Sequence, residues 1–302
     1  MIVRTTGNSL SMLLAIRGSV VPQIWPRILV VGLAAAVVVT VPHVWTQPLP
    51  SISLAPFSLI GLVLSIFLGF RNNACYDRWW EARKQWGHLI AQTRALGREL
   101  PLLLPGTAGE RSVRRVIGFC TCLGARLRNQ DELIATARWL APDEAARLAG
   151  VRNRPQAILR HLSGEIVAAH RAGAFGEVSL RLLEDRIEEL NAVQAACERI
   201  RSTPTPFAYS LLLHRTSWIF CLLSPFGLWE TCGIATPLFS LVLAYAFFGL
   251  DALGDELEEP FGLLPNDLPL DAMVRIIEID LLEAVGETDL PEPRTPVKYQ
   301  LT

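Results

Sequence analysis

Four long apolar stretches constrain the fold of this chain more than any other feature of its sequence. Three cover residues 28–44, 54–70 and 234–250, and the fourth joins 207–213 to 217–228. Each has about 17 to 20 residues, close to the minimum for an α-helix that crosses a hydrocarbon core of about 30 Å. A soluble helical core could explain any one of them. Four stretches paired by two short connectors, in a chain that is 51% hydrophobic, instead favour four membrane spans.

The basic residues are distributed unevenly around these stretches. Segments 43–58 and 217–248 contain no Lys or Arg, whereas basic side chains flank the other ends of the apolar stretches. Cytoplasmic loops of membrane proteins carry an excess of Lys and Arg. The pattern therefore predicts that both termini and the long middle region face the cytoplasm.

The sequence predicts an all-α membrane protein in five parts. These are a cytosolic N-terminal segment (1–27), the first two spans (28–70), a cytosolic helical domain (71–206), the last two spans (207–250), and a cytosolic C-terminal segment with an extended tail (251–302).

Helix signals recur in the polar parts of the chain. A Thr-x-x-Glu capping box at 107–110 predicts a helix start, and Pro142 predicts the start of a short helix. Amphipathic patterns predict helices over 155–170, 178–200 and 269–285. The proline-rich tail at 291–296 cannot be helical and is expected to lie extended.

No residue pattern indicates an enzyme, a metal site or a cofactor. The six cysteines have neither zinc-site nor disulfide spacing, so we expect reduced and mostly buried thiols. Cys120 and Cys122 point apart on a helix, and His161 and His170 lie on opposite sides of another. No phosphate loop, nucleophile elbow or Ser/His/Asp set is recognisable. A net charge of −1 gives no reason to expect nucleic acid binding.

The second apolar stretch contains two rows of residues at helical spacing. Gly61, Ser65 and Gly69 share one face, where a small-xxx-small pattern allows another helix to pack closely within the bilayer. A neighbouring face carries Leu62, Ile66 and Phe70, which rise about 12 Å from first to last. From spacing alone this larger row could face lipid, the protein core or a central axis.

No break separates this stretch from the charged, aromatic segment that follows it. We expect Arg71 and Arg78 to pair with acids that follow the fourth span, among them Asp251, Asp255 and Glu258, and Glu81 to take part in the same charge pairing. His214 and Arg215 lie at the inner membrane boundary. There they could pair with the same acids, snorkel or serve the function directly.

Four ordered segments resemble the bestrophin family, specifically its bacterial branch. They are RGSVVPQIWPRIL (17–29), FLGFRNNACYDRWWEARKQWG (67–87), TPTPFAYSLLLHRT (203–216) and DELEEPFG (255–262), so the resemblance covers nearly the whole chain. It implies a homopentamer around a central pore in the bacterial cytoplasmic (inner) membrane. Three apolar rings of the pore neck would fall on Leu62, Ile66 and Phe70, and a cytosolic aperture on Ile187.

One departure from the family pattern concerns calcium. In animal bestrophins an acidic run directly after the Pro-Phe-Gly motif forms a calcium clasp, and here that run is missing after Gly262. Calcium needs six to eight oxygen ligands, several of them carboxylates. The sequence therefore predicts a channel that is not calcium-activated.

The resulting expectation is a pentamer that conducts monovalent ions passively. The resemblance to the bacterial branch, which includes cation-permeable channels, favours permeation of Na⁺ and K⁺. The alternatives are a chloride-selective or anion-selective channel of the same architecture, and a non-conducting membrane scaffold or sensor. An apolar neck does not by itself select the sign of the ion.

Overall fold

The computed structural model describes residues 1–4, 12–44 and 53–302. Apart from two isolated β-bridges, the secondary structure in this part of the chain is helical. The chain divides into two compact units. The first contains Met1–Arg4, Trp80–Thr203 and Pro260–Thr302, and the second contains Thr5–Trp79 and Pro204–Glu259. The second unit thus extends past residue 70 and past residue 250, where the sequence placed domain boundaries.

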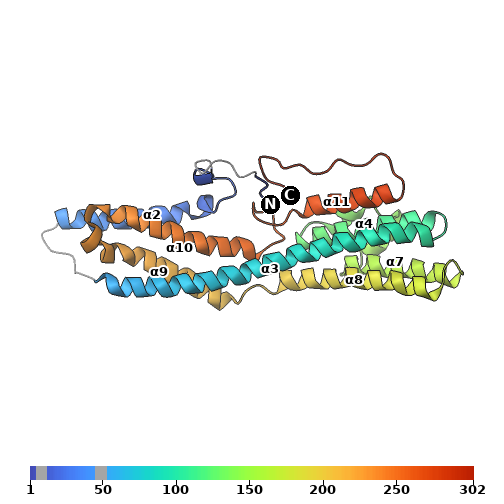
Figure 1. Cartoon of the computed structure of the whole chain (residues 1–302), viewed down its shortest axis with the longest axis horizontal. Helices are drawn as coiled ribbons and strands as arrows, with labels where there is room; N and C mark the ends of the chain where they lie inside the picture. The colour runs from blue at the N-terminus through green and yellow to red at the C-terminus, as the bar shows by residue number, and fades with distance from the viewer. Residues whose placement is uncertain (5–11, 45–52) are drawn as a thin grey trace. The chain divides into compact units, whose positions relative to one another are not determined.

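The second unit holds the apolar helices (Figure 1). These are α2 (Val21–Val44), the beginning of α3 (Leu54–Leu103), α9 (Phe207–Cys232), the 3₁₀ turn η1 (Gly233–Ala235) and α10 (Thr236–Glu258). Helix α10 packs against both α2 and α9, and α2 packs against α9. These helices enclose a hydrophobic core, which includes Ile24, Leu64, Leu68, Phe220 and Phe248.

Three helical stretches in the described part of the chain are long and apolar enough to cross a membrane. They are Val21–Val41, Leu54–Leu103 and Phe207–Glu258, the last of which contains α9, η1 and α10. Most of the predicted connector between the first two apolar stretches, residues 45–52, lies outside the described residues.

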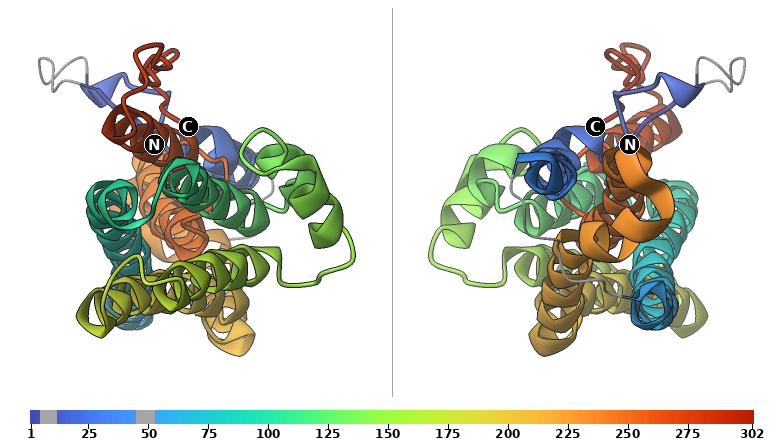
Figure 2. Two further views of the ribbon diagram at one scale, coloured as in Figure 1. Left: turned by 90° about the vertical axis from the view of Figure 1, so that its right-hand side faces the viewer. Right: turned by 90° about the vertical axis from the view of Figure 1, so that its left-hand side faces the viewer.

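The first unit is built around α4 (Thr107–Leu127). This helix packs against α5 (Glu132–Thr136), α7 (Arg154–Arg171), α8 (Glu177–Ser202) and α11 (Leu270–Ala284), and the short α6 (Pro142–Leu148) contacts α5. Figure 2 shows α7 and α8 side by side on one side of this unit. Val116, Ile117, Phe119 and Leu123 of α4 are fully buried, because the neighbouring helices cover the apolar side of α4.

Most helices of the first unit begin and end within two residues of their predicted bounds, but two details differ. The predicted capping box is wrong: the N-cap of α4 is Gly106 at φ +57°, without a side-chain cap. A positive φ suits Gly because it has no Cβ. Helix α5 was not predicted, although Asp131 caps it by accepting hydrogen bonds from the backbone N–H groups of Leu133 and Ile134.

The N-terminal and C-terminal segments of the first unit pair with each other (Figure 1). The backbone N–H of Val3 donates to Tyr299 O over 2.8 Å, and Leu301 N–H donates to Met1 O over 2.9 Å. The tail at 291–296 is not helical, as its prolines predict. It is held to α11 where Arg275 Nη1 donates to Glu292 O over 3.2 Å.

Candidate functional site

The predicted neck residues form an exposed apolar row along α3. Leu62, Ile66 and Phe70 are 59%, 47% and 60% exposed in the single chain. On the other side of the helix Leu64 and Leu68 are buried in the core of the second unit. The row is therefore free to face lipid, another copy of the chain or a pore, and it does not belong to this chain's own core.

The predicted row of small residues is divided between two environments. A Cβ on Gly61 would lie 3.0 Å from the Phe220 ring, so Gly61 permits close packing of α3 on α9. The Ser65 hydroxyl donates to Gly61 O of its own helix over 2.7 Å. A Cβ on Gly69 would meet no described heavy atom within 4 Å. Ser65 and Gly69 thus leave a shallow open face next to the apolar row.

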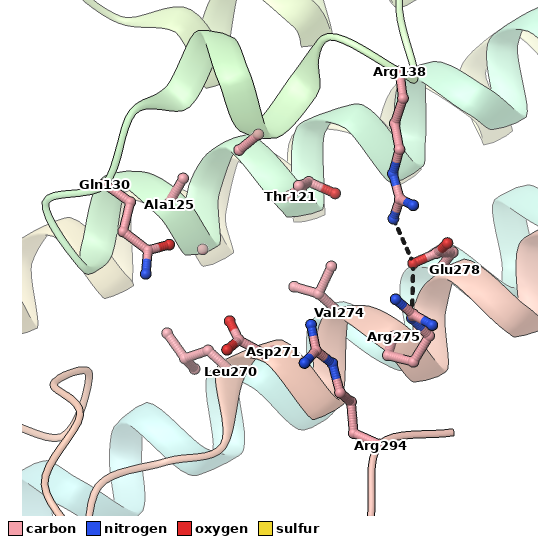
Figure 3. Close-up of a pocket in the computed structure, with 12 residues that line it drawn as sticks. Thr121, Ala125, Gln130, Arg138, Leu270, Asp271, Val274, Arg275, Glu278 and Arg294 are labelled. Carbon is pink, nitrogen blue, oxygen red and sulfur yellow. Dashed lines mark hydrogen bonds and ion pairs between the residues drawn. The ribbon is translucent and has the colours of Figure 1, made fainter. Parts of the chain in front are cut away.

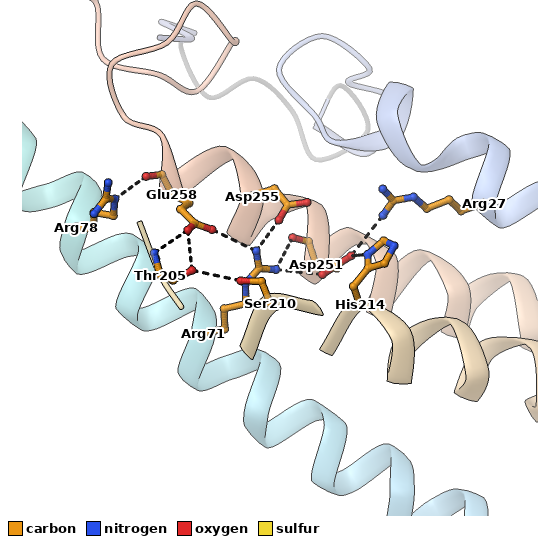
Figure 4. Close-up of polar contacts among 9 residues, drawn as sticks. All are labelled: Arg27, Arg71, Arg78, Thr205, Ser210, His214, Asp251, Asp255 and Glu258. Atoms are coloured by element: carbon orange, nitrogen blue, oxygen red, sulfur yellow. Dashed lines mark hydrogen bonds and ion pairs between the residues drawn. The ribbon is translucent and has the colours of Figure 1, made fainter. Parts of the chain in front are cut away.

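Directly after this row, α3 is held to α10 by a buried charge cluster (Figure 4). Arg71 and Asp251 are each 1% exposed, and Arg71 Nη1 lies 3.0 Å from Asp251 Oδ1. The same nitrogen donates to Asp251 O over 3.2 Å. Arg71 Nη2 contacts Asp255 and lies 3.5 Å from Glu258 Oε2. A buried charge is tolerated when it is paired and hydrogen-bonded in this way.

Asp251 also receives side chains from the other two helices of the unit. Arg27 Nη1 of α2 lies 3.3 Å from Asp251 Oδ2, and His214 Nδ1 of α9 lies 2.7 Å from the same atom (Figure 4). One carboxylate therefore joins α2, α3, α9 and α10. Of the alternatives left open for His214, the structure supports pairing with these acids.

Glu258 forms the second centre of the charge cluster. Its Oε1 accepts hydrogen bonds from the backbone N–H of Thr205 over 2.8 Å and from the Thr205 hydroxyl over 2.6 Å. Its backbone carbonyl accepts from Arg78 Nε over 2.6 Å (Figure 4). The loop before α9 is thereby tied to the end of α10. Glu81, also predicted to pair, has Lys84 at 2.8 Å and Gln85 at 2.7 Å on its own helix.

A glycine permits the close approach of α3 and α10 at this cluster. A Cβ at position 254 would lie 2.7 Å from Asn72 Oδ1 and 3.1 Å from Arg71 Nη1. Gly254 lies between Asp251 and Asp255 on α10, so the guanidinium of Arg71 occupies the space that a side chain would fill.

The sequence missed several members of the cluster. Arg27 and Thr205 were not assigned to it, nor was the contact between Gln23 and Glu256 on the α2 side of α10. Arg27 carried a signal, because it directly precedes an apolar stretch, where a lone charge has to find a partner or reach the interface.

Ile187, the predicted aperture residue, lies on α8 in the first unit. It is only 8% exposed, on the side of α8 that carries the buried Leu183 and Leu190. With Leu159 and Ser163 of α7 it lines a hollow between the two helices. A single chain thus leaves only a small part of Ile187 exposed, and its role at a cytosolic aperture stays a prediction.

The described residues offer no group of three His, Cys, Asp or Glu side chains arranged to hold a metal ion. Asp267, the acid that follows the Pro-Phe-Gly motif most closely, accepts a hydrogen bond from Leu264 N over 2.7 Å and is buried. The cysteines form no disulfide in the described part of the chain, and five of the six are buried.

Comparisons with known proteins relate this whole arrangement to one family. A family model described as Bacterial/Fungal Bestrophin protein matches residues 1–283. The sequence is 45% identical over 288 residues to a voltage-dependent anion channel-forming protein of Mesorhizobium japonicum, covering 95% of this chain and 93% of that protein. It is 40% identical over 304 residues to the voltage-dependent anion channel-forming protein YneE of Escherichia coli (strain K12), covering 100% of both.

Solved structures show the same similarity. The crystal structure of a bacterial bestrophin homolog from Klebsiella pneumoniae matches with a TM-score of 0.83 at 35% sequence identity. The match covers 87% of this chain and 99% of that one.

Proposed function

Because the chain belongs to the bacterial and fungal bestrophin family of ion channels, we propose that it forms a passive, anion-preferring channel as a homopentamer. The observation that carries this proposal is the exposed row Leu62, Ile66 and Phe70. A large apolar row left uncovered beside a core-facing row suits a helix that lines a shared pore. A cyclic arrangement of five copies would turn each residue of the row into an apolar ring.

We propose that each chain contributes four spans to this assembly. The long apolar stretch Phe207–Glu258 contains two helices joined at η1, and a reversal there would give two crossings. The absence of Lys and Arg from 217–248 supports an external position for this turn, with both termini in the cytoplasm of a bacterium and the spans in its inner membrane.

Anion preference replaces cation preference as the main proposal. Two relatives at 45% and 40% identity are named as anion channel-forming proteins. The positive edge of the Phe70 ring, if it faces the pore, would act in the same direction. The opposing feature is Asp77, which is exposed on the same face of α3 two turns after Phe70 and would favour cations.

The neck is proposed as the gate of the channel, and Ile187 as its cytosolic aperture. An apolar ring obstructs ions by dewetting, so the width of the neck sets whether it conducts. We also propose that calcium does not activate the channel through the segment after Gly262, because the Asp267 carboxylate already binds its own turn.

Current through purified protein in liposomes tests the proposal. Under a NaCl gradient the sign of the reversal potential distinguishes anion from cation preference, and replacement of Na⁺ by N-methylglucamine should leave an anion current intact. Loss of the current in N-methylglucamine chloride would show that cations carry it. No current in any salt would favour the scaffold or sensor alternative.

Truncation of the neck tests the assignment of the pore row. Phe70→Ala should raise single-channel conductance, because it removes the largest ring of the narrowest section. Phe239→Ala on α10 is the matched control, since Phe239 is similarly exposed but lies on another helix. Equal conductance of Phe70→Ala and the parent channel would refute the assignment.

A further inference from the structure

A polar hollow in the first unit has no role in the proposed ion pathway. It has a volume of about 130 Å³ and lies between α4, α11 and the proline-rich tail (Figure 3). This volume is large enough for water or a small ligand, since a cavity needs only about 10–15 Å³ on this measure to hold one water molecule. Ala125, Leu270 and Val274 supply apolar wall, and several arginines converge on the opening.

The acidic groups of this hollow are already neutralised. Glu278 Oε2, in a nearly buried side chain, lies 2.9 Å from Arg138 Nη2 and 3.0 Å from Arg275 Nε. Asp271 Oδ1 lies 2.6 Å from Arg128 Nη1. Each carboxylate is therefore matched by at least one guanidinium of its own, and Glu278 is matched by two.

Arg294 adds a further positive charge. Its guanidinium points into the hollow from the tail (Figure 3), and no hydrogen bond or ion pair to it is found among the described residues. The flanking Pro293 and nearby Pro296 restrict the backbone that carries it. The tail thus places the Arg294 guanidinium at the opening of the hollow. The carboxylates of the hollow are already paired with other arginines.

A neutral donor lies in the same hollow. The backbone N–H of Gln130 donates to Ala125 O over 2.9 Å, whereas its side-chain amide lines the hollow and makes no hydrogen bond within the described part of the chain. Arg138 is kept in place by the ring of Trp139, 4.4 Å from its guanidinium carbon. The hollow therefore has more positive charge and more hydrogen-bond donors than its own acceptors use. A small anionic ligand requires such an excess.

We propose that this hollow binds a small oxyanion, a phosphate or a carboxylate, with Arg294 as the main ligand and Gln130 as a second donor. A planar guanidinium matches the two oxygens of such a group, which chloride does not offer. None of the residues that line the hollow belongs to the proposed neck, and the proposal does not depend on the sign of the ion that the channel conducts.

Isothermal titration of the full-length protein in detergent, at constant NaCl, tests the site. Inorganic phosphate and acetate are the two probes, and they distinguish a phosphate site from a carboxylate site. We expect saturable binding of at least one probe, weakened about tenfold or more in Arg294→Gln, as expected when a charged hydrogen bond is lost. Arg294→Lys should restore only part of the affinity, because the bidentate geometry is missing.

Arg181→Gln is the matched control, because Arg181 is exposed on α8 and does not line the hollow. It should bind the probe as the parent protein does. The proposal is overturned if neither probe binds saturably, or if Arg294→Gln and Arg181→Gln bind equally well. Liposome currents of Arg294→Gln should match the parent, which separates a failure of this site from a failure of the channel assignment.

Discussion

Asp251→Asn tests the charge cluster that joins the four apolar helices of the second unit. The change keeps the size of the side chain and removes its charge. Arg71, 1% exposed, then loses the carboxylate 3.0 Å from its Nη1. Removing one partner of a buried ion pair costs about 3–5 kcal/mol, because the other charge stays buried without compensation.

Other acids reduce this cost for Arg71. Asp255 and Glu258 both contact Arg71 Nη2, so part of the charge remains matched. The amide introduced at position 251 could also still accept one hydrogen bond from Nη1. We therefore expect the lower end of the range, about 3 kcal/mol. At about 2–4 °C per kcal/mol for a chain of this size class, the melting temperature should fall by roughly 6–12 °C.

The assay is thermal unfolding of the purified protein in detergent. Size-exclusion chromatography or tryptophan fluorescence measures the fraction that remains folded at each temperature. Asp255→Asn is the matched control. Asp255 contacts the same guanidinium but its side chain is 55% exposed, so its loss should cost about 1 kcal/mol or less. The double variant Arg71→Met with Asp251→Leu should be more stable than Asp251→Asn, because both charges that are 1% exposed are gone. Arg27 and Asp255, which also lose a partner, are 29% and 55% exposed. Equal melting temperatures for Asp251→Asn and Asp255→Asn would refute the argument.

Three further predictions concern the first unit. Gly109→Ala should destabilise the protein by about 1–3 kcal/mol, because the new Cβ would lie 2.9 Å from Pro101 Cα. Gly164→Ala, where a Cβ would meet no described atom within 4 Å, should stabilise it by about 0.5–1 kcal/mol in the same melting assay. Burial raises the pKa of the Cys120 and Cys122 thiols, so both should resist iodoacetamide at pH 8 until the protein unfolds. Rapid labelling of either thiol in the folded protein, detected by mass spectrometry, would contradict their burial.

The charge cluster could be predicted from the sequence only in outline. An uninterrupted helix with Arg71 and Arg78, and an acidic segment after the last apolar stretch, were enough to expect pairing across about 180 residues. Helical spacing would also have distinguished Asp251, Asp255 and Glu258, which share one face of α10, from the other acids of the segment. Glu256 lies about 100° away from Asp255 and contacts Gln23 instead. The roles of Arg27 and Thr205 depend on tertiary packing that no local pattern contains.

The aperture role of Ile187 was assigned by counting along a helix, and it stays a prediction. The buried residues of α8 include Leu183, Ile187, Leu190 and Cys197, at spacings of three, four and seven. That period places Ile187 with the core side of the helix. A shift of one residue turns a side chain by about 100°, which is enough to change a core position into an exposed one. The aperture prediction therefore depends on the exact register of the count along α8.

The same geometry explains why a buried arginine directly follows the last residue of the exposed row. Phe70 and Arg71 differ by one position and hence by about 100° around α3. Phe70 is 60% exposed and Arg71 is 1% exposed, so the contacts of Arg71 with α10 fix the rotation of the helix. A rotation that brought Phe70 into the core would separate Arg71 from Asp251, Asp255 and Glu258. The cost of that separation, several kcal/mol, holds Leu62, Ile66 and Phe70 on the side of α3 that the chain leaves open.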